Sequence, residues 1–229
     1  MRKIAVLQSN YIPWKGYFDI IHDVDEFIFY DEVQFTKNDW RNRNRIYTQN
    51  GVEWLTVPVE GSITKSIDEV RTVSGKWQQK HYNALVTNYS KAPFFSRYKE
   101  FLEYVYLDKH WEYLFEINRF MIETISRDFL GCKTVFTESR SYFSEGSGHQ
   151  KLLSLLKAAG AEYYLSGPAA KDYIVASDYE SAGIELHWKD YGSYPKYPQM
   201  HEPFVHEVSI LDLLFNTGPD ASEYIWGSK

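Results

Sequence analysis

Residues 4–7 read Ile-Ala-Val-Leu, and residues 26–30 read Glu-Phe-Ile-Phe-Tyr. Both runs are short, apolar and rich in β-branched or aromatic side chains, which predicts buried strands. Between them, apolar residues fall at 14, 17, 18, 20, 21 and 24, the spacing of a helix with a wide apolar face. A strand, a helix and a second strand in so short a stretch favour parallel pairing with a right-handed crossover. We therefore expect residues 4–7 to form a central parallel strand.

A β-hairpin is predicted next, because Asn50-Gly51 separates the strand-like residues 45–48 and 52–57 and both turn residues tolerate positive φ. A helical block follows over residues 76–130, with Gly131 at the position where a helix ends. The remaining expected elements are strands over 67–73, 133–137, 163–166 and 184–188 and helices over 148–159 and 208–215.

This alternation indicates an α/β fold with a mostly parallel sheet, helices on both faces, a β-hairpin excursion and a helical insert at about 76–130. No composition shift marks a boundary, so we expect one domain over residues 1–229. The net charge of −6 argues against general nucleic-acid binding, and no apolar run is long enough to span a bilayer. The single Cys132 excludes an internal disulfide and a cysteine-built zinc site, and no metal site is predicted. We expect a cytoplasmic protein.

Three predicted strand ends carry polar chemistry, and in open α/β sheets ligands bind beyond the carboxyl ends of the strands. Residues 8–17 place Gly16 near a helix start, where backbone N–H groups can approach an anion. Residues 31–45 hold four cations within nine residues, interleaved with Asn and Trp. They suit phosphate or carboxylate capture, or form a solvated loop whose arginines pair with its own carboxylates. Residues 165–173 run from a strand through Ser-Gly-Pro into a helix start, or form a plain connection.

Other candidates stand outside these three loops. His81 lies in a predicted helix and has the pKa for acid–base work near neutrality, although a lone helix histidine is more often inert. Residues 146–149 (Gly-Ser-Gly-His) imitate a nucleophile loop, but the Gly-x-Ser-x-Gly pattern of hydrolases is missing. His201 and His206 flank Glu202 without the spacing or third ligand of a metal site.

The run Gln-Ser-Asn-Tyr-Ile-Pro-Trp-Lys-Gly-Tyr-Phe over residues 8–18 resembles the opening of the WbqC-like family. The resemblance continues in the same order over residues 31–35, 40–44, 80–81, 91–95, 164–173 and 209–216. Members of this family occur in bacterial polysaccharide and O-antigen gene clusters. The resemblance implies transfer of glycine or a related acyl group to an amino sugar, and it supplies no catalytic residues that can be carried over.

The opening strand, loop, helix and strand are also similar to the adenylylating α/β superfamily of nucleotidyltransferases and pantothenate synthetase. Those enzymes carry His-x-Gly-His at the start of the first helix, where this chain reads Trp14-Lys15-Gly16-Tyr17. The glycine is kept and both histidines are missing, which argues against nucleotidyl transfer by that signature.

The leading hypothesis is an enzyme that forms an amide on the amine of a nucleotide-linked amino sugar. The alternatives are a non-catalytic nucleotide-sugar or acyl-carrier binding protein and a degenerate nucleotidyltransferase. The acyl donor would be free glycine with ATP, an aminoacyl-tRNA or a thioester carrier, and no cofactor is specified. The partner is a small-molecule nucleotide sugar.

Site roles follow from this hypothesis. The predicted catalytic residues are His81 and Asp31, as alternative general bases, and Gln8. Lys37, Arg41 and Arg43 are assigned to phosphates, and Trp14 and Trp40 to stacking on a base or sugar. The other predicted substrate-binding residues are Tyr11, Gly16, Tyr17, Gln34, Asn44, Ser166, Gly167, Lys171 and Tyr173. We expect one pocket to be lined by Gln8, Tyr11, Gly16, Asp31, Lys37, Arg43 and Asn44 together with Ser166 and Lys171.

Overall fold

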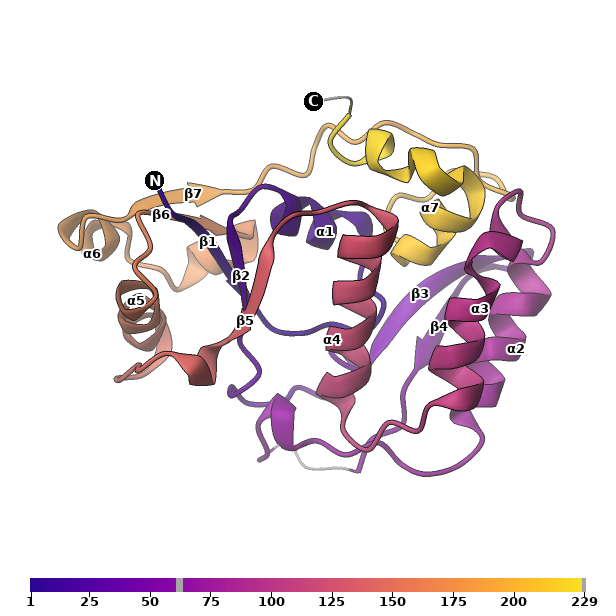
Figure 1. The fold of residues 1–229 in the computed structure, drawn as a ribbon, viewed down its shortest axis with the longest axis horizontal. Helices are drawn as coiled ribbons and strands as arrows, with labels where there is room; N and C mark the ends of the chain where they lie inside the picture. The colour runs from indigo at the N-terminus through magenta and orange to yellow at the C-terminus, as the bar shows by residue number, and fades with distance from the viewer. Residues whose placement is uncertain (61–63, 228–229) are drawn as a thin grey trace.

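Five parallel strands form the main sheet of the computed structural model, which describes residues 1–60 and 64–227. Their order across the sheet is β5-β2-β1-β6-β7 (Figure 1). The strands are β1 (Lys3–Leu7), β2 (Glu26–Phe29), β5 (Val135–Glu138), β6 (Tyr163–Ser166) and β7 (Glu185–Trp188). β1 pairs in parallel with both β2 and β6, which confirms the prediction of a central parallel strand.

The strand order contains a reversal beside β1. The chain builds outward from β1 through β2 to β5, and then returns to the other side of β1 to add β6 and β7. In such sheets the connections from the two strands beside the reversal run over opposite faces of the sheet. Their separation opens a crevice at the carboxyl ends of these strands. That switch point lies between β1 and β6.

Helices cover both faces of the sheet, as the sequence predicts. Figure 1 shows α1 and α4 on one side of the sheet and α5 and α6 on the other. Ala5, Phe27 and Phe29 pack into the core that includes α1 and α4, whereas Ile4 and Val6 pack with residues of α5 and α6. The helices are α1 (Lys15–His22), α2 (Trp77–Tyr89), α3 (Lys99–Glu103), α4 (Leu114–Thr124), α5 (Gly148–Ala158), α6 (Ala176–Ser181) and α7 (Ile210–Thr217).

The predicted hairpin forms a separate two-stranded sheet, β3 (Arg43–Thr48) with β4 (Gly51–Thr56). Gly51 has φ 101°, a backbone conformation that favours glycine and closes the turn. The sheet begins two residues before the predicted start, so the arginine-rich segment itself enters β3. Alternate β3 side chains therefore point to opposite faces of the hairpin.

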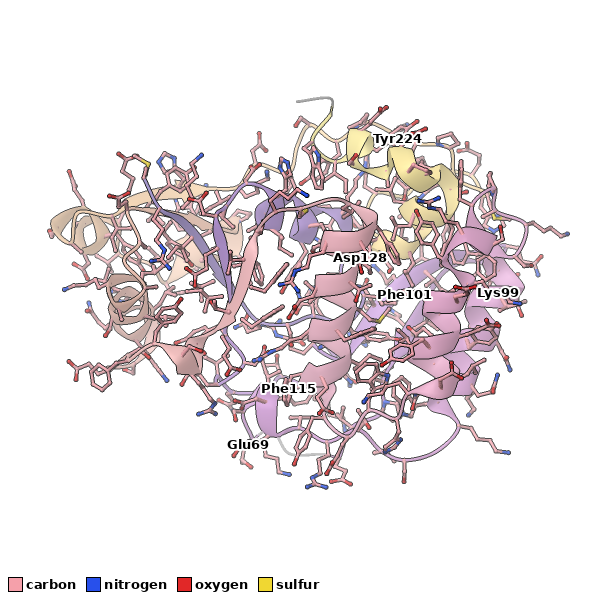
Figure 2. The ribbon with its side chains drawn as sticks, viewed as in Figure 1. Glu69, Lys99, Phe101, Phe115, Asp128 and Tyr224 are labelled. Atoms are coloured by element: carbon pink, nitrogen blue, oxygen red, sulfur yellow. The ribbon has the colours of Figure 1, made fainter. Side chains whose placement is uncertain are left out.

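The helical insert lies beside the hairpin. α3 continues into a π-helical turn (Tyr104–Asp108), and α4 continues into another (Ile125–Phe129). Phe101 of α3 packs between these helices against Phe120 and Phe129, with ring centroids 6.2 and 5.1 Å away (Figure 2). Gly131 follows with φ 71° and ends the block where the sequence places a helix stop.

The prediction of a strand over residues 67–73 is wrong. Ile67–Glu69 form a 3₁₀ turn, in which the side chain of Glu69 accepts hydrogen bonds from the backbone N–H and the hydroxyl of Ser66. Ile67 and Val70 are both fully buried, and their separation of three residues is that of a turn rather than of a strand. The capping interaction between Ser66 and Glu69 therefore favours a turn here, although the residues that follow alternate as in a strand.

Asp31, directly after β2, ties together several parts of the carboxyl edge of the sheet. Its side chain is fully buried. One oxygen accepts the backbone N–H of Ser9 at 2.7 Å, and the other accepts Nε of Arg119 on α4 at 2.7 Å. Arg119 also donates to Glu138 at the end of β5, at 2.8 Å. Burial raises the pKa of Asp31, and Arg119 and Ser9 oppose that rise.

We expect Arg119→Met to lower the free energy of unfolding by about 3–5 kcal/mol, because it leaves the buried Asp31 carboxylate without its cation. Chemical denaturation monitored by circular dichroism measures this loss. Arg127→Met is the matched control, since Arg127 makes an exposed pair with Glu123, and its expected effect is below about 1 kcal/mol. Equal effects of the two substitutions would contradict this role of Asp31.

Candidate functional site

A cavity of about 510 Å³ lies at the carboxyl end of β1, and we call it the switch-point cavity. It combines the end of β1, the residue after β2 and the start of α5, which is where the strand order reverses. Its lining residues are Val6, Leu7, Gln8, Tyr30, Val33, Gln34, Gly146, Ser147, Gly148, Lys151, Leu152 and Tyr173. Its volume falls within the range of small-molecule sites.

The start of α5 supplies one wall of this cavity. Gly146 and Gly148 have φ 93° and 54°, so the chain turns sharply on both sides of Ser147. The Ser147 side chain makes no cap hydrogen bond within the described chain, which leaves the first N–H groups of α5 without a side-chain acceptor. These donors and the helix dipole favour an anion at this end of α5.

Cations and hydroxyls complete the polar part of the cavity. Lys151, one turn into α5, pairs with Glu32 at 2.9 Å. Burial raises the pKa of Tyr30 to about 12, helped by Glu32 and Tyr173, so its hydroxyl remains a donor at neutral pH. Burial also raises the pKa of Tyr173, and the nearby positive charge of Arg41 opposes that rise. The buried Nε of Arg41 finds no acceptor in the part of the chain that the structure describes.

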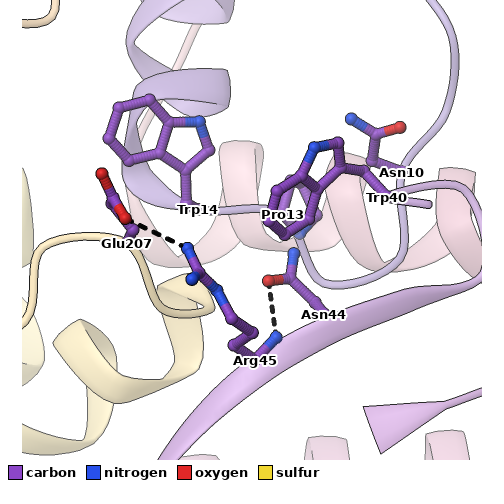
Figure 3. Close-up of a pocket in the computed structure, with 7 residues that line it drawn as sticks. All are labelled: Asn10, Pro13, Trp14, Trp40, Asn44, Arg45 and Glu207. Carbon is purple, nitrogen blue, oxygen red and sulfur yellow. Dashed lines mark hydrogen bonds and ion pairs between the residues drawn. The ribbon is translucent and has the colours of Figure 1, made fainter. Parts of the chain in front are cut away.

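A second cavity of about 360 Å³ lies against the hairpin, and we call it the hairpin cavity (Figure 3). Its lining residues are Asn10, Pro13, Trp14, Trp40, Asn44, Arg45 and Glu207. Arg45 pairs with Glu207 at 3.3 Å, and its guanidinium carbon lies 5.4 Å from the centre of the Trp40 ring. Two indoles, one cation and one carboxylate thus surround a single space.

The loop over residues 8–14 separates the two cavities, and buried Asn44 fixes its shape. Nδ2 of Asn44 donates to the carbonyl oxygens of Tyr11 and Ile12, both at 3.0 Å. Ile12 has φ 37°, a strained conformation for a β-branched residue. Such strain persists only where surrounding contacts impose it, and it is concentrated at functional sites.

Gly16 lies beneath Trp14. A Cβ atom at position 16 would stand 2.4 Å from the indole, so only glycine allows the ring to rest on the α1 backbone. The rings of Tyr191 and Tyr194 pack against the same indole at interplanar angles of 67° and 83°, with centroids 5.1 and 5.8 Å away. Gly16 therefore shapes the wall of the hairpin cavity through Trp14 rather than by contacting an anion.

The outer face of the hairpin carries a ladder of arginine and tryptophan. The guanidinium of Arg43 lies 4.2 Å from the Trp54 ring centre, and Arg45 lies 5.6 Å from the same ring. Trp40 and Trp54 are 5.5 Å apart and about two-fifths exposed. Arg43 thus points away from Asp31, and the ion pair between them that the sequence allowed is replaced by Asp31 with Arg119. Lys37 is exposed on the loop before β3.

His81 lies in the core rather than among the lining residues of either described cavity. Its Nδ1 is 2.8 Å from the hydroxyl of Tyr11, which is 2.6 Å from the hydroxyl of Tyr106. Burial lowers the pKa of His81 to about 4. Tyr17 is also buried, and its hydroxyl donates to the carbonyl oxygen of Gln8 at 2.9 Å. These contacts hold the loop over residues 8–14 from beneath.

The expected single pocket is divided between two cavities, which corrects the sequence-based expectation. Gln8, Gln34 and Tyr173 line the switch-point cavity, and Trp14, Trp40 and Asn44 line the hairpin cavity. The third predicted loop contributes only Tyr173, because Ser166 is buried, Gly167 faces the Tyr191 hydroxyl, and Lys171 lies over the Trp188 ring. The loop over residues 31–45 therefore contributes to both cavities.

Reasoning from the sequence misses two features, one that lines the switch-point cavity and one that lies outside the lining residues of both cavities. The first is the loop over residues 146–148, which lacks a hydrolase pattern, although glycines flanking Ser147 before an amphipathic helix signal an anion-binding turn. The other is Lys15, which is buried among aromatic rings, with Nζ 5.0 Å from the Tyr194 ring and 5.1 Å from the Tyr197 ring. Burial lowers the pKa of Lys15 to about 8.

Stability should fall in acid because His81 is buried as the neutral imidazole. The unfolded chain gains a proton near the ordinary value of 6.5, whereas the folded chain resists it until about pH 4. Protonation therefore favours the unfolded state as the pH falls from 6.5 to 4, by about 3 kcal/mol at most. Urea titrations across this range measure the slope.

His81→Asn should flatten that slope, because it keeps a hydrogen-bonding partner for Tyr11 and removes the titrating group. The matched control is His187→Asn, at a half-exposed position on β7, which should keep the slope of the unchanged protein. An unaltered slope in His81→Asn would show that other groups cause the acid sensitivity.

Comparisons with known proteins identify a relative and a family whose matches cover almost the whole chain. The chain is 41% identical over 227 residues to a Mycobacterium tuberculosis protein described as uncharacterized protein Rv1507c, and the match covers 98% of each. No solved structure matches. Across the described residues, no helix is long and apolar enough to cross a membrane, and no group of three His, Cys, Asp or Glu side chains could hold a metal ion. A model of the WbqC-like protein family matches residues 8–224, so the chain belongs to that family.

Proposed function

We propose that this protein binds a nucleotide-linked amino sugar at the switch-point cavity and transfers glycine or a related acyl group to its amine in bacterial polysaccharide (O-antigen) biosynthesis. The observation that carries the proposal is the joint placement of the β1 end, the α5 start and Lys151 around one cavity. Nucleotide ligands occupy the corresponding crevice in doubly wound sheets. The acyl chemistry rests on the family resemblance.

The phosphates of the substrate fit the start of α5. The turn at Gly146 and Gly148 exposes backbone donors, and Lys151, paired with Glu32, adds a cation one turn further along the helix. Arg41 is not among the lining residues and pairs with Asp39 at 3.1 Å, but it adds a positive charge near Tyr173 and its buried Nε has no partner among the described residues. An anion at this position would satisfy donors that the described protein groups leave unpaired.

The transfer itself forms one bond and breaks one. The neutral amine of the sugar attacks the carbonyl carbon of an activated acyl donor, the carbon–nitrogen bond forms, and the donor's activating group leaves with the electron pair of its bond. The amine loses one proton, which passes to the departing group directly or through solvent. The uncharged polar groups able to orient the sugar here are the amides of Gln8 and Gln34 and the hydroxyls of Tyr30, Ser147 and Tyr173.

One observation favours the second candidate, a non-catalytic nucleotide-sugar binding protein. Both proposed bases, His81 and Asp31, are buried, and Asp31 already binds Ser9 and Arg119. Product analysis separates the two functions: mass spectrometry should detect the acylated nucleotide sugar if the protein is a transferase. The nucleotide sugar could instead stabilise the protein against heat while no product forms from glycine with ATP, aminoacyl-tRNA or an acyl thioester. That result would favour the non-catalytic binding protein.

Lys151→Met should weaken binding of nucleotide-linked amino sugars roughly tenfold to a hundredfold, because it removes a charge-assisted contact to phosphate. Calorimetric titration measures the affinity. Glu32→Gln is the matched control, since it breaks the same ion pair and leaves the cation in place. If both variants bind as the unchanged protein does, the phosphates do not lie at α5.

A further inference from the structure

We infer that the hairpin cavity binds a guanine base, as the base of the nucleotide-linked substrate. This inference rests on the proposed function in one respect, that the base belongs to the nucleotide of that substrate. The walls of the cavity are suited to a flat ring. Figure 3 shows the indoles of Trp14 and Trp40 on opposite sides, with the Arg45–Glu207 pair nearer Trp14 and Asn10 beside Trp40. Indole faces stack on bases.

The polar groups of this cavity are an adjacent donor and acceptor. Arg45 and Glu207 are in contact at 3.3 Å, so a ligand edge meets an N–H donor beside a carboxylate acceptor. Guanine presents this complement, because O6 and N7 accept from arginine and the neighbouring N1–H and N2 amine donate to a carboxylate. Adenine places an amine donor where guanine has O6, and that amine would face the guanidinium.

Two buried atoms at this cavity lack partners among the described residues. Nε of Arg45 is a donor and Oδ1 of Asn10 is an acceptor. Native proteins pair almost all buried polar groups, so a donor and an acceptor left open at one cavity point to a ligand that carries both. Arg45 is held in place by Trp54 and Trp40, which fixes the direction of its fork.

The position of the cavity agrees with a nucleotide that spans the loop over residues 8–14. Gln8 lines the switch-point cavity and Asn10 lines the hairpin cavity. Their Cα atoms are two residues apart along the chain, which limits their separation to about 7 Å. The two cavities therefore approach each other at this loop, and the inference places the base in the hairpin cavity and the phosphates in the switch-point cavity.

Calorimetric titration with guanosine, inosine and adenosine 5′-monophosphates tests the inference, because these three ligands share the sugar and the phosphate. We expect guanosine monophosphate to bind tightest, inosine monophosphate roughly tenfold more weakly for loss of the N2 amine, and adenosine monophosphate weakest. Equal affinity for guanosine and adenosine monophosphates, or no binding by either, would overturn it.

Variants assign the contacts to this cavity. Glu207→Ala should abolish the difference in affinity between guanosine and inosine monophosphates, and Trp40→Ala should weaken all three ligands at least tenfold. Glu112→Ala is the matched control, since Glu112 forms a similarly exposed pair with Arg71 outside the cavity, and it should bind normally. Thermal melting of each variant checks folding. Guanine-selective binding that survives both cavity substitutions would place the base elsewhere and refute the inference.

Product analysis keeps this inference separate from the proposed transfer. If amide forms on uridine- or thymidine-linked amino sugars while guanosine monophosphate fails to bind, the guanine assignment is wrong and the transferase stands. If guanosine monophosphate binds through Glu207 and no nucleotide sugar is acylated, the guanine assignment is supported and the proposed acyl transfer is wrong.

Discussion

The buried carboxylate of Asp31 is the contact on which the carboxyl edge of the sheet depends. It joins the backbone after β1 to Arg119 of α4, and through Arg119 it reaches Glu138 at the end of β5. A charge in this position is tolerated only because both of its oxygens are satisfied. The strand ends and the helical insert are consequently held in one arrangement, and the loop over residues 8–14 starts from a fixed point.

That loop organises the rest of the site. The hydroxyl of Tyr11, in the loop, is hydrogen-bonded to His81 and Tyr106 in the core. Asn44 of the hairpin donates to two successive carbonyl oxygens of the loop. These contacts impose the left-handed conformation of Ile12 and direct Gln8 and Asn10 into different cavities. One loop thereby forms a wall of both cavities, which is the geometry that a ligand extended across it requires.

The high aromatic content, 17% of the chain, has a specific use in this structure. Tyr89 and Tyr197 both donate to the buried Asp212, and Tyr194 donates to Asp19. Lys15 is enclosed by tyrosine rings, and Arg43 and Arg45 lie on indoles. Aromatic side chains provide apolar area together with a polar tip or a face that attracts cations, so they allow charged groups to be placed inside the protein.

The sequence by itself determined the fold class and the central strand, because local patterns report burial directly: the run Ile-Ala-Val-Leu requires two covered faces, and Asn-Gly requires a turn. It also indicated that residues 8–17 and 31–45 gather at one edge. It could not separate structural from ligand-facing polar residues. Asp31, His81 and Asn44 are chemically suited to catalysis or binding, yet their partners come from 22 to 88 positions away in the chain. Only the tertiary structure decided which polar groups are enclosed in the core and which, such as Lys151 and Arg45, line a cavity, because burial depends on contacts that no local pattern encodes.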